Sequence, residues 1–81
     1  KAADENLRTA QATLERAKAD QERAKINYDR TEKLWKEGLL AKQEYDQRRV
    51  DVDAFAAAVR EAEARIAQVR AQRQQAAAGL S

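Results

Sequence analysis

The side chains that most often carry out catalysis are missing from this sequence or stand at unsuitable spacings. The chain of 81 residues contains no Cys and no His, and its only Ser is the last residue. Carboxylates are abundant, but the close pairs Asp51/Asp53 and Glu61/Glu63 are two positions apart, which places them on different sides of a helix. Such pairs do not act together as general acid and base. The sequence therefore predicts no catalytic residue, no cofactor and no metal site, in a chain that is not an enzyme.

Three arginines, Arg65, Arg70 and Arg73, form the most basic stretch, with no acidic residue after Glu63. A nucleic-acid-binding surface usually shows a stripe of one charge sign. Here 16 Lys and Arg are interleaved with 14 Asp and Glu, for a net charge of +2, as on a solvated helix. We therefore interpret the three arginines as a solvated helix end and expect no nucleic-acid partner.

Two adjacent leucines, Leu39 and Leu40, stand near the middle of the chain, beside a glycine. Leu40 can pack on Tyr45 as a hydrophobic staple at the start of a following helix. If both leucines were exposed, they would indicate a contact surface for another protein.

The elements that position these residues are two long helices. Pro is absent, and Gly38 is the only helix breaker in the interior of the chain, between the helix-forming stretches of about 2–37 and about 42–78. Because the connection 38–41 is short, the helices must be antiparallel neighbours. We predict an all-α fold that is a single antiparallel two-helix coiled-coil hairpin over residues 1–81, excised from a longer protein.

The spacing of small and apolar residues predicts how the two helices face each other. One seam runs from Ala3 to Trp35 and the other from Tyr45 to Ala76, in alternating steps of four and three. In a folded-back hairpin, facing positions add up to a constant, and here they add up to 79 or 80 in ten layers. The layers include Trp35/Tyr45, Ala24/Phe55, Ala17/Ala62, Leu14/Ile66, Ala10/Val69, Leu7/Arg73 and Ala3/Ala76.

Gly38 also predicts the geometry of the turn, because glycine best tolerates the left-handed conformation that ends many helices. With Gly38 in that place, Leu34 and Leu39 are the pair that makes the hydrophobic contact of a Schellman ending. Leu34 can serve this cap, a docking contact or both. Ala41 would be the N-cap of the second helix, where the lack of a side-chain oxygen costs about 1 kcal/mol relative to Ser.

The turn segment carries a spaced motif. Arg30 is followed after three residues by Leu34 and after six more by Ala41, and the run Lys-Gln-Glu-Tyr-Asp occupies 42–46. With the preceding Glu-Gly-Leu-Leu at 37–40, this pattern resembles the hairpin tip of periplasmic membrane fusion proteins. These are the adaptor subunits of tripartite efflux pumps and related secretion systems of Gram-negative bacteria. That family usually has Ser where this chain has Ala41.

The resemblance implies a structural role in transport, including multidrug efflux, and not catalysis. In such adaptors, six hairpins line a conduit, and their tips dock onto a TolC-like outer-membrane channel. Further domains join the hairpin to an inner-membrane transporter of the RND or ABC type, which places the chain in the periplasm within a protein anchored at the inner membrane. The implied docking residues are Arg30, Leu34, Gly38, Leu39, Leu40, Ala41 and Lys42.

The alternative is a generic coiled-coil arm that binds RNA or another protein in the cytosol. An RNA-binding arm would carry a basic face along one edge and bind nucleic acid in a salt-sensitive manner. The interleaved charges argue against that interpretation.

Overall fold

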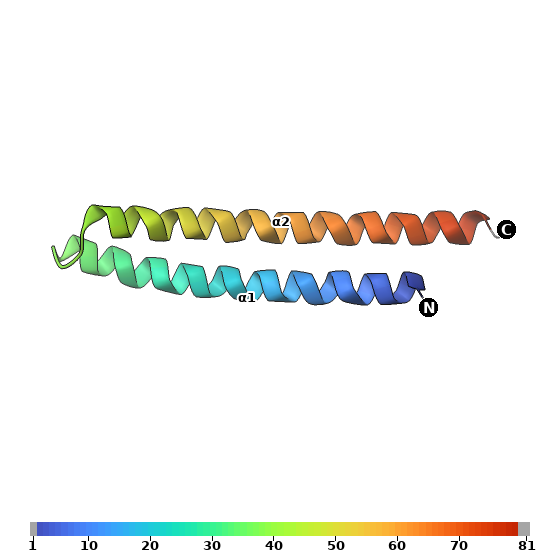
Figure 1. The fold of residues 1–81 in the computed structure, drawn as a ribbon, viewed down its shortest axis with the longest axis horizontal. Helices are drawn as coiled ribbons and strands as arrows, with labels where there is room; N and C mark the ends of the chain where they lie inside the picture. Colours follow the sequence, from blue (N-terminus) through green and yellow to red (C-terminus); the bar gives the residue numbers. More distant parts are fainter. Residues whose placement is uncertain (1, 80–81) are drawn as a thin grey trace.

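A computed structural model describes residues 2–79, including the side chains of all of them except Ala3. It contains two helices, α1 (Ala2–Lys36) and α2 (Lys42–Gly79), which lie side by side and run in opposite directions (Figure 1). Together they form a rod of 66 × 15 × 12 Å. The predicted all-α antiparallel hairpin is thereby confirmed; residues 1, 80 and 81 of the predicted domain lie outside the described residues.

The helix boundaries agree with the prediction to within one residue at each end. The first helix ends at Lys36 rather than at 37, because the backbone at Glu37 already belongs to the turn. Its N–H still donates to the Lys33 carbonyl at 3.2 Å, which is the last helical bond of α1. The second helix continues through Gly79 rather than ending at 78. Within residues 2–79, neither helix combines the length and apolar character needed to cross a membrane.

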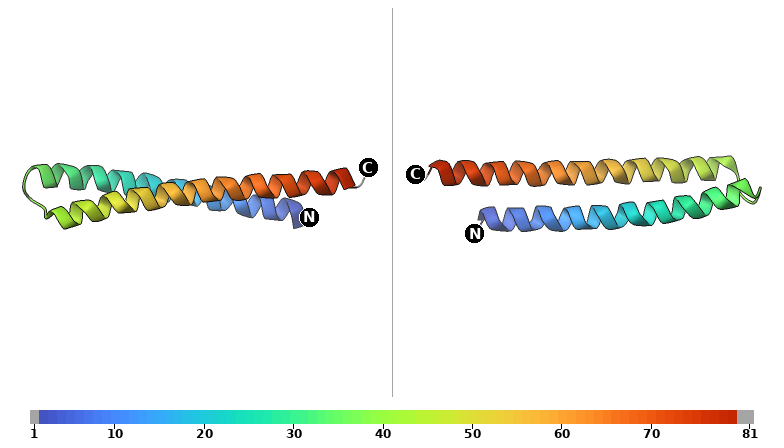
Figure 2. Two further views of the ribbon diagram at one scale, coloured as in Figure 1. Left: turned by 90° about the horizontal axis from the view of Figure 1, so that it is seen from above. Right: turned by 180° about the vertical axis from the view of Figure 1, so that it is seen from behind.

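The two helices also wrap around each other. Seen from above, they cross near their middles, and α2 extends beyond the start of α1 (Figure 2). This crossing is expected of helices that keep a heptad seam in contact. A heptad repeat has 3.5 residues per turn, whereas a straight helix has 3.6, so the helices must wind around each other to keep the seam together.

The core is a thin seam in which α1 contributes only alanines and α2 contributes mostly larger residues. Small side chains on one helix let the backbones approach closely, so that the larger side chains of the other fill the remaining space. The buried residues are Ala10, Ala17 and Ala24 of α1 and Val59, Ala62, Ile66 and Val69 of α2.

The packing clusters confirm the predicted register. Ala10 packs with Ile66 and Val69, and the half-buried Leu14 contacts this cluster. Ala17 forms a second cluster with Val59 and Ala62, to which Leu14 also belongs. These groups contain the predicted layers 10/69, 14/66 and 17/62.

At the open end of the hairpin, a charged pair replaces apolar packing. Arg73, predicted opposite Leu7, binds the carboxylate of Asp4 across the helices at 3.0 Å, and both side chains are about half exposed. The predicted layer of Ala3 and Ala76 lies outside the described side chains. We expect little stability from this end, since exposed ion pairs contribute only about 0–1 kcal/mol.

Candidate functional site

The turn has the hydrogen bonds of a complete Schellman ending. Gly38 adopts a φ of +77°, its N–H donates to the carbonyl of Trp35 at 2.9 Å, and the Leu39 N–H donates to the carbonyl of Leu34 at 2.9 Å. These are the two bonds that define the motif, so the sequence prediction for Gly38 is confirmed. The bonds satisfy carbonyls at the end of α1 and fix the direction in which the chain leaves the helix.

The two leucines of the turn differ in exposure. Leu39 leaves 68% of its surface exposed, so the hairpin itself covers little of this side chain. Leu40 and Leu34 are half-buried. One leucine therefore projects from the tip, and the other two pack partly against the hairpin.

The start of α2 confirms Ala41 as the N-cap residue. Its carbonyl accepts the N–H groups of Glu44 at 3.1 Å and Tyr45 at 3.3 Å, the first bonds of the helix. Ala41 and Lys42 are exposed. Ala41 offers no side-chain acceptor to the first free N–H groups of α2.

Arg30 lies one helical turn before Leu34 and therefore on the same face of α1. Its side chain is exposed, and among residues 2–79 no hydrogen bond or ion pair engages it. The structure thus brings the sequence-predicted residues to one end of the rod. Arg30 and the half-buried Leu34 lie on α1, and the exposed Leu39 lies in the turn. The exposed Ala41 and Lys42 lie at the start of α2.

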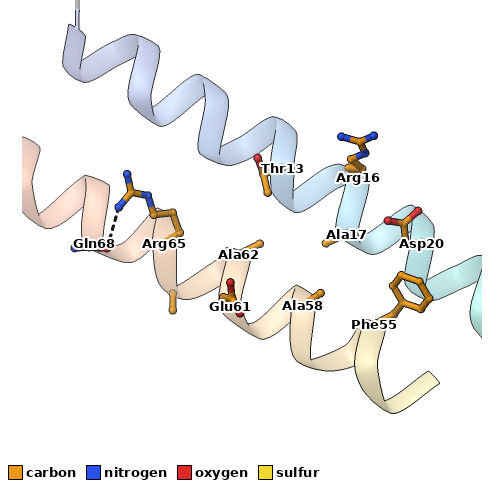
Figure 3. Close-up of a pocket in the computed structure, with 11 residues that line it drawn as sticks. Thr13, Arg16, Ala17, Asp20, Phe55, Ala58, Glu61, Ala62, Arg65 and Gln68 are labelled. Atoms are coloured by element: carbon orange, nitrogen blue, oxygen red, sulfur yellow. Dashed lines mark hydrogen bonds between the residues drawn. The ribbon is translucent and has the colours of Figure 1, made fainter. Parts of the chain in front are cut away.

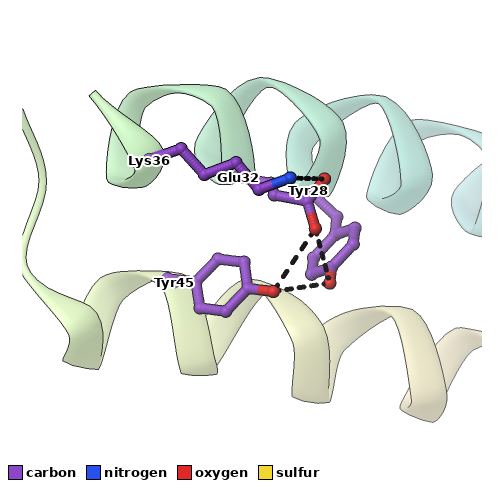
Figure 4. Close-up of polar contacts among 4 residues, drawn as sticks. All are labelled: Tyr28, Glu32, Lys36 and Tyr45. Carbon is purple, nitrogen blue, oxygen red and sulfur yellow. Dashed lines mark hydrogen bonds and ion pairs between the residues drawn. The ribbon is translucent and has the colours of Figure 1, made fainter. Parts of the chain in front are cut away.

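Behind the turn, a cluster of aromatic rings joins the two helices. Trp35 stacks on Tyr45 with ring centroids 4.5 Å apart, and Tyr45 stacks on Tyr28 at 5.5 Å. The hydroxyls of the two tyrosines are 2.9 Å apart, and each lies 3.4 Å from Glu32, which also pairs with Lys36 at 3.9 Å (Figure 4). Trp35 and Tyr45 are therefore packing residues, as predicted, and their stacking joins the two helices behind the turn.

The polar side of this cluster changes the acidity of one tyrosine. The hydrogen bond to Tyr45, together with burial and the nearby charges of Tyr45 and Glu32, raises the pKa of Tyr28 to about 12. Tyr28 is consequently a neutral phenol throughout the physiological range. It acts as a hydrogen-bonding group that fixes Tyr45.

Sequence reasoning missed this hydroxyl network and one buried polar atom without a hydrogen-bond partner. Glu32 stands four residues after Tyr28, a spacing that could have indicated their contact. The hydrogen bond from Tyr45 to Glu32 joins different helices, and sequence spacing does not reveal it. Arg48 occupies a seam position, where it binds Asp51 at 3.3 Å while its Nε is buried without a hydrogen-bond partner.

The residues at the tip are suited to binding another protein. Among the described residues, no group of acidic side chains is arranged to hold a metal ion. The grooves along the rod are shallow and open, and the tip itself is convex. A convex end that combines an exposed leucine with exposed cations is suited to entering a complementary surface of another protein.

Comparison with known proteins matches the chain to a family. The model of a protein family described as "RND MFP, alpha-helical hairpin domain" matches residues 6–76, which span the turn and all but the outer ends of both helices. No curated protein and no solved structure matches the chain.

Proposed function

The chain belongs to the family of α-helical hairpin domains of RND membrane fusion proteins, and we propose from this membership that the tip of the hairpin docks onto a TolC-type outer-membrane channel. The family consists of adaptor domains, so the function of the hairpin is to contact other proteins. Within that role, the proposal assigns the contact to Arg30, Leu34 and the turn 38–42.

The observation that carries the proposal is the exposure of Leu39 on a fixed turn. An apolar side chain with 68% of its surface exposed gains about 1–2 kcal/mol when a partner covers it. Because the Schellman bonds already hold the turn, little conformational entropy is lost on binding. The proposed contact is therefore modest in each hairpin and gains strength when several hairpins bind together.

Exposed cations near the tip supply direction. Lys42 is the first residue of α2, and Arg30 lies on α1 about two helical turns before Gly38; both side chains are exposed. Arg30 can bind a carboxylate or a carbonyl of the channel through two parallel N–H donors, which fixes orientation as well as affinity. Ala41 offers no hydroxyl, so this tip docks without the side-chain hydrogen bond that a Ser would provide.

The wider assembly follows from the same proposal. Neighbouring adaptor hairpins, six in a ring, form the wall of a periplasmic conduit, and further domains of the adaptor contact the inner-membrane transporter. The family description favours an RND transporter over an ABC transporter.

The test uses the adaptor that carries this hairpin and a purified TolC-type channel. Arg30→Asp and Leu39→Asp should each weaken binding, measured by surface plasmon resonance, by about tenfold or more, since each removes a contact and adds a charge. Efflux by cells that carry these variants should fall in parallel.

Val50→Asp is the matched control, because Val50 is also an exposed apolar residue but lies on α2 away from the turn, with 52% of its surface exposed. It should leave channel binding unchanged. If Leu39→Asp binds the channel as tightly as the unchanged adaptor while circular dichroism shows the same helix content, the docking assignment is wrong.

A further inference from the structure

A shallow groove beside the seam shows which charged residues share one side of the rod. It has a volume of about 560 Å³, and its lining includes Arg16 of α1 and Glu61 of α2 (Figure 3). The guanidinium of Arg16 points away from α2, towards the outside of the rod (Figure 3). Glu15 lines a groove on the other side of the seam, because consecutive residues of a helix are about 100° apart. The neighbours Glu15 and Arg16 therefore carry opposite charges to opposite sides of the rod.

Two Glu-Arg dipeptides of α1, residues 15–16 and 22–23, repeat this arrangement. They are one heptad apart, so both glutamates lie on one side of the rod and both arginines on the other. Ala19 lies between the two dipeptides on the outward face of α1, opposite the seam. The outward face of α1 is thus negative along one edge and positive along the other.

The Arg-Glu dipeptide of α2, residues 60–61, carries these charges in the opposite order. Glu61 lies on the side of Arg16, and Arg60 lies on the side of Glu15. In the confirmed register, residues 60–61 are level with residues 18–20 of α1, midway between the two Glu-Arg dipeptides. The outward faces of the two helices are therefore complementary in charge when they stand at the same height.

We propose that α1 of each hairpin packs along α2 of its neighbour in the ring of adaptors. The Arg-Glu dipeptide of one hairpin then lies between the two Glu-Arg dipeptides of the next, so that Arg60 meets two glutamates and Glu61 meets two arginines. The inference rests on the proposed function, because hairpins whose tips meet one channel stand side by side at the same height. It adds the faces and the residues through which they touch.

The charged side chains are available for these contacts. All six are exposed. Within residues 2–79, no hydrogen bond or ion pair engages Glu15, Arg16, Glu22, Arg60 or Glu61. Arg23 binds Asp20, and its guanidinium has further donors for a second carboxylate.

Small residues on the outward faces allow the two helices to approach each other. Ala19 on α1 and Ala64 on α2, one helical turn after Arg60, are both exposed. Side chains of this size let helix backbones come close enough for the charges beside them to meet. Because α1 and α2 wind around each other, a straight neighbour follows this face over only part of the rod (Figure 2). The contact is therefore centred on the level of the three dipeptides.

The charges distinguish this arrangement from two others. A reversed neighbour would place α2 against α2, with Arg60 against Arg60 of the second copy, and like charges oppose association. A two-fold axis along the rod would also place α2 against α2, but with Arg60 against Glu61 of the second copy. That pair is attractive, yet such an interface closes as a dimer and does not continue into a ring.

The experiment is analytical ultracentrifugation, at low salt, of the adaptor that carries this hairpin. Arg60→Glu combined with Glu61→Arg keeps the net charge and should raise the dissociation constant of self-association about tenfold or more, because like charges then meet. A further exchange of both Glu-Arg dipeptides (Glu15→Arg, Arg16→Glu, Glu22→Arg and Arg23→Glu) should restore it to within about threefold. In a pair with a two-fold axis along the rod, the first exchange would have no effect, since each charge would still meet its opposite.

Asp53 provides a variant that should strengthen the contact. It lies one heptad before Arg60, on the side where the neighbour carries its glutamates, and it is exposed. Asp53→Lys replaces a repulsive charge by an attractive one and should lower the dissociation constant about threefold.

Cross-linking tests the geometry directly. An Ala19→Cys adaptor mixed with an Ala64→Cys adaptor should give a mixed dimer with a short bismaleimide, because the two positions are about 5 Å apart in height. Ala71→Cys is the matched control, on the same face of α2 but about 16 Å from the level of Ala19, and it should give little product. The unchanged adaptor is the blank. Dimers of Ala19→Cys with itself would place α1 against α1 and overturn the proposal.

Channel binding separates this inference from the docking proposal. Surface plasmon resonance is carried out with the adaptor below its self-association constant, where single adaptors bind. There, Leu39→Asp should weaken channel binding and the exchange at residues 60–61 should not, whereas Leu39→Asp should leave self-association unchanged. If Leu39→Asp binds the channel normally, only the docking proposal fails. If the exchange at residues 60–61 leaves self-association unchanged while helix content is retained, or if the adaptor stays monomeric up to about 1 mM, this inference is wrong.

Discussion

The indole ring of Trp35, at the end of α1, lies parallel to the phenol ring of Tyr45, at the start of α2, with centroids 4.5 Å apart and planes within 8°. The chain reverses direction between these two residues, so the stack closes the hairpin directly behind its turn. Because Tyr45 also stacks on Tyr28 and meets its hydroxyl, one side chain of α2 is held by two aromatic residues of α1.

The first prediction concerns Tyr45. Tyr45→Ala removes the ring from both stacks and should lower the free energy of unfolding by about 2–3 kcal/mol, less than for a fully buried aromatic because Tyr45 is half-buried. Urea denaturation followed by circular dichroism measures the loss. The fluorescence of Trp35 in the folded variant should shift to longer wavelength, since water replaces its stacking partner.

Tyr45→Phe separates the two contributions. It keeps the ring and removes only the hydroxyl, so the loss should be about 0.5–1.5 kcal/mol. If Tyr45→Ala is no less stable than Tyr45→Phe, the stack does not stabilise the hairpin.

The second prediction concerns Gly38. Its φ of +77° is unfavourable for residues with a Cβ, whereas an added Cβ would meet no atom within 4 Å. Gly38→Ala should therefore cost about 1 kcal/mol from backbone conformation alone. Gly38→Asn should cost less, because asparagine tolerates this region. Thermal unfolding measures both.

Gly79→Ala is the matched control, because this glycine also has open space around it but no positive φ. It should leave the melting temperature unchanged or slightly raised, since alanine favours the helix. Equal losses at both positions would show that the turn does not depend on the left-handed conformation of Gly38.

The third prediction is that replacing a charged seam residue stabilises the hairpin. Arg48 stands in the seam with its Nε buried and unpaired, while its ion pair with Asp51 is partly exposed. Arg48→Leu removes the unpaired donor and adds apolar contact, which should raise the free energy of unfolding by about 1 kcal/mol. Losing the ion pair costs less than that.

Arg49→Leu tests whether the gain depends on the seam, because the neighbouring Arg49 is exposed. Its stability in urea should stay within about 0.5 kcal/mol of the parent. A destabilised Arg48→Leu would mean that the contacts made by the Arg48 side chain outweigh the cost of its buried Nε.

The sequence was sufficient to predict the helices, the register and the turn, because each depends on a periodic or local rule. Steps of four and three predicted the layers of Ala10/Val69 and Ala17/Ala62, and a single glycine between two helix-forming stretches predicted the Schellman ending.

Contacts that depend on the rotamers of long side chains could not be predicted in this way. The hydroxyl pair of Tyr28 and Tyr45 and the ion pair of Asp4 and Arg73 cross between helices, where sequence spacing gives the level of a residue but not its rotamer. The same applies to the tip, where two adjacent leucines look alike in sequence and only Leu39 projects.

The fourth prediction is a pH dependence of stability that arises from Tyr28. Its pKa is raised from 10.0 to about 12 in the folded state, so the folded chain keeps the phenol proton after the unfolded chain has lost it. This contribution to stability is complete below pH 10 and disappears as the pH rises through about 12. Urea denaturation at pH 9 and pH 11 should show the decrease.

Tyr28→Phe isolates this contribution, because it keeps the ring and removes the titrating group. The variant should be less stable at pH 9, and its stability should decline less between pH 9 and pH 11 than that of the parent. If both proteins lose stability equally over this range, the dependence belongs to other groups and not to Tyr28.

The fifth prediction concerns the cap of α2. Ala41 holds the N-cap position through its carbonyl, which accepts from Glu44 and Tyr45, but it has no side-chain acceptor for the free N–H groups of the first turn. Ala41→Ser supplies one, and Glu44 three residues later completes a capping box. The free energy of unfolding should rise by about 1 kcal/mol, measured by thermal denaturation.

Ala57→Ser, an exposed position in the interior of α2, should instead lower stability by about 0.5 kcal/mol, because serine is a poorer helix former than alanine. The opposite signs distinguish a cap from a general effect of serine, and a loss at both positions would show that Ala41 does not act as the N-cap of α2.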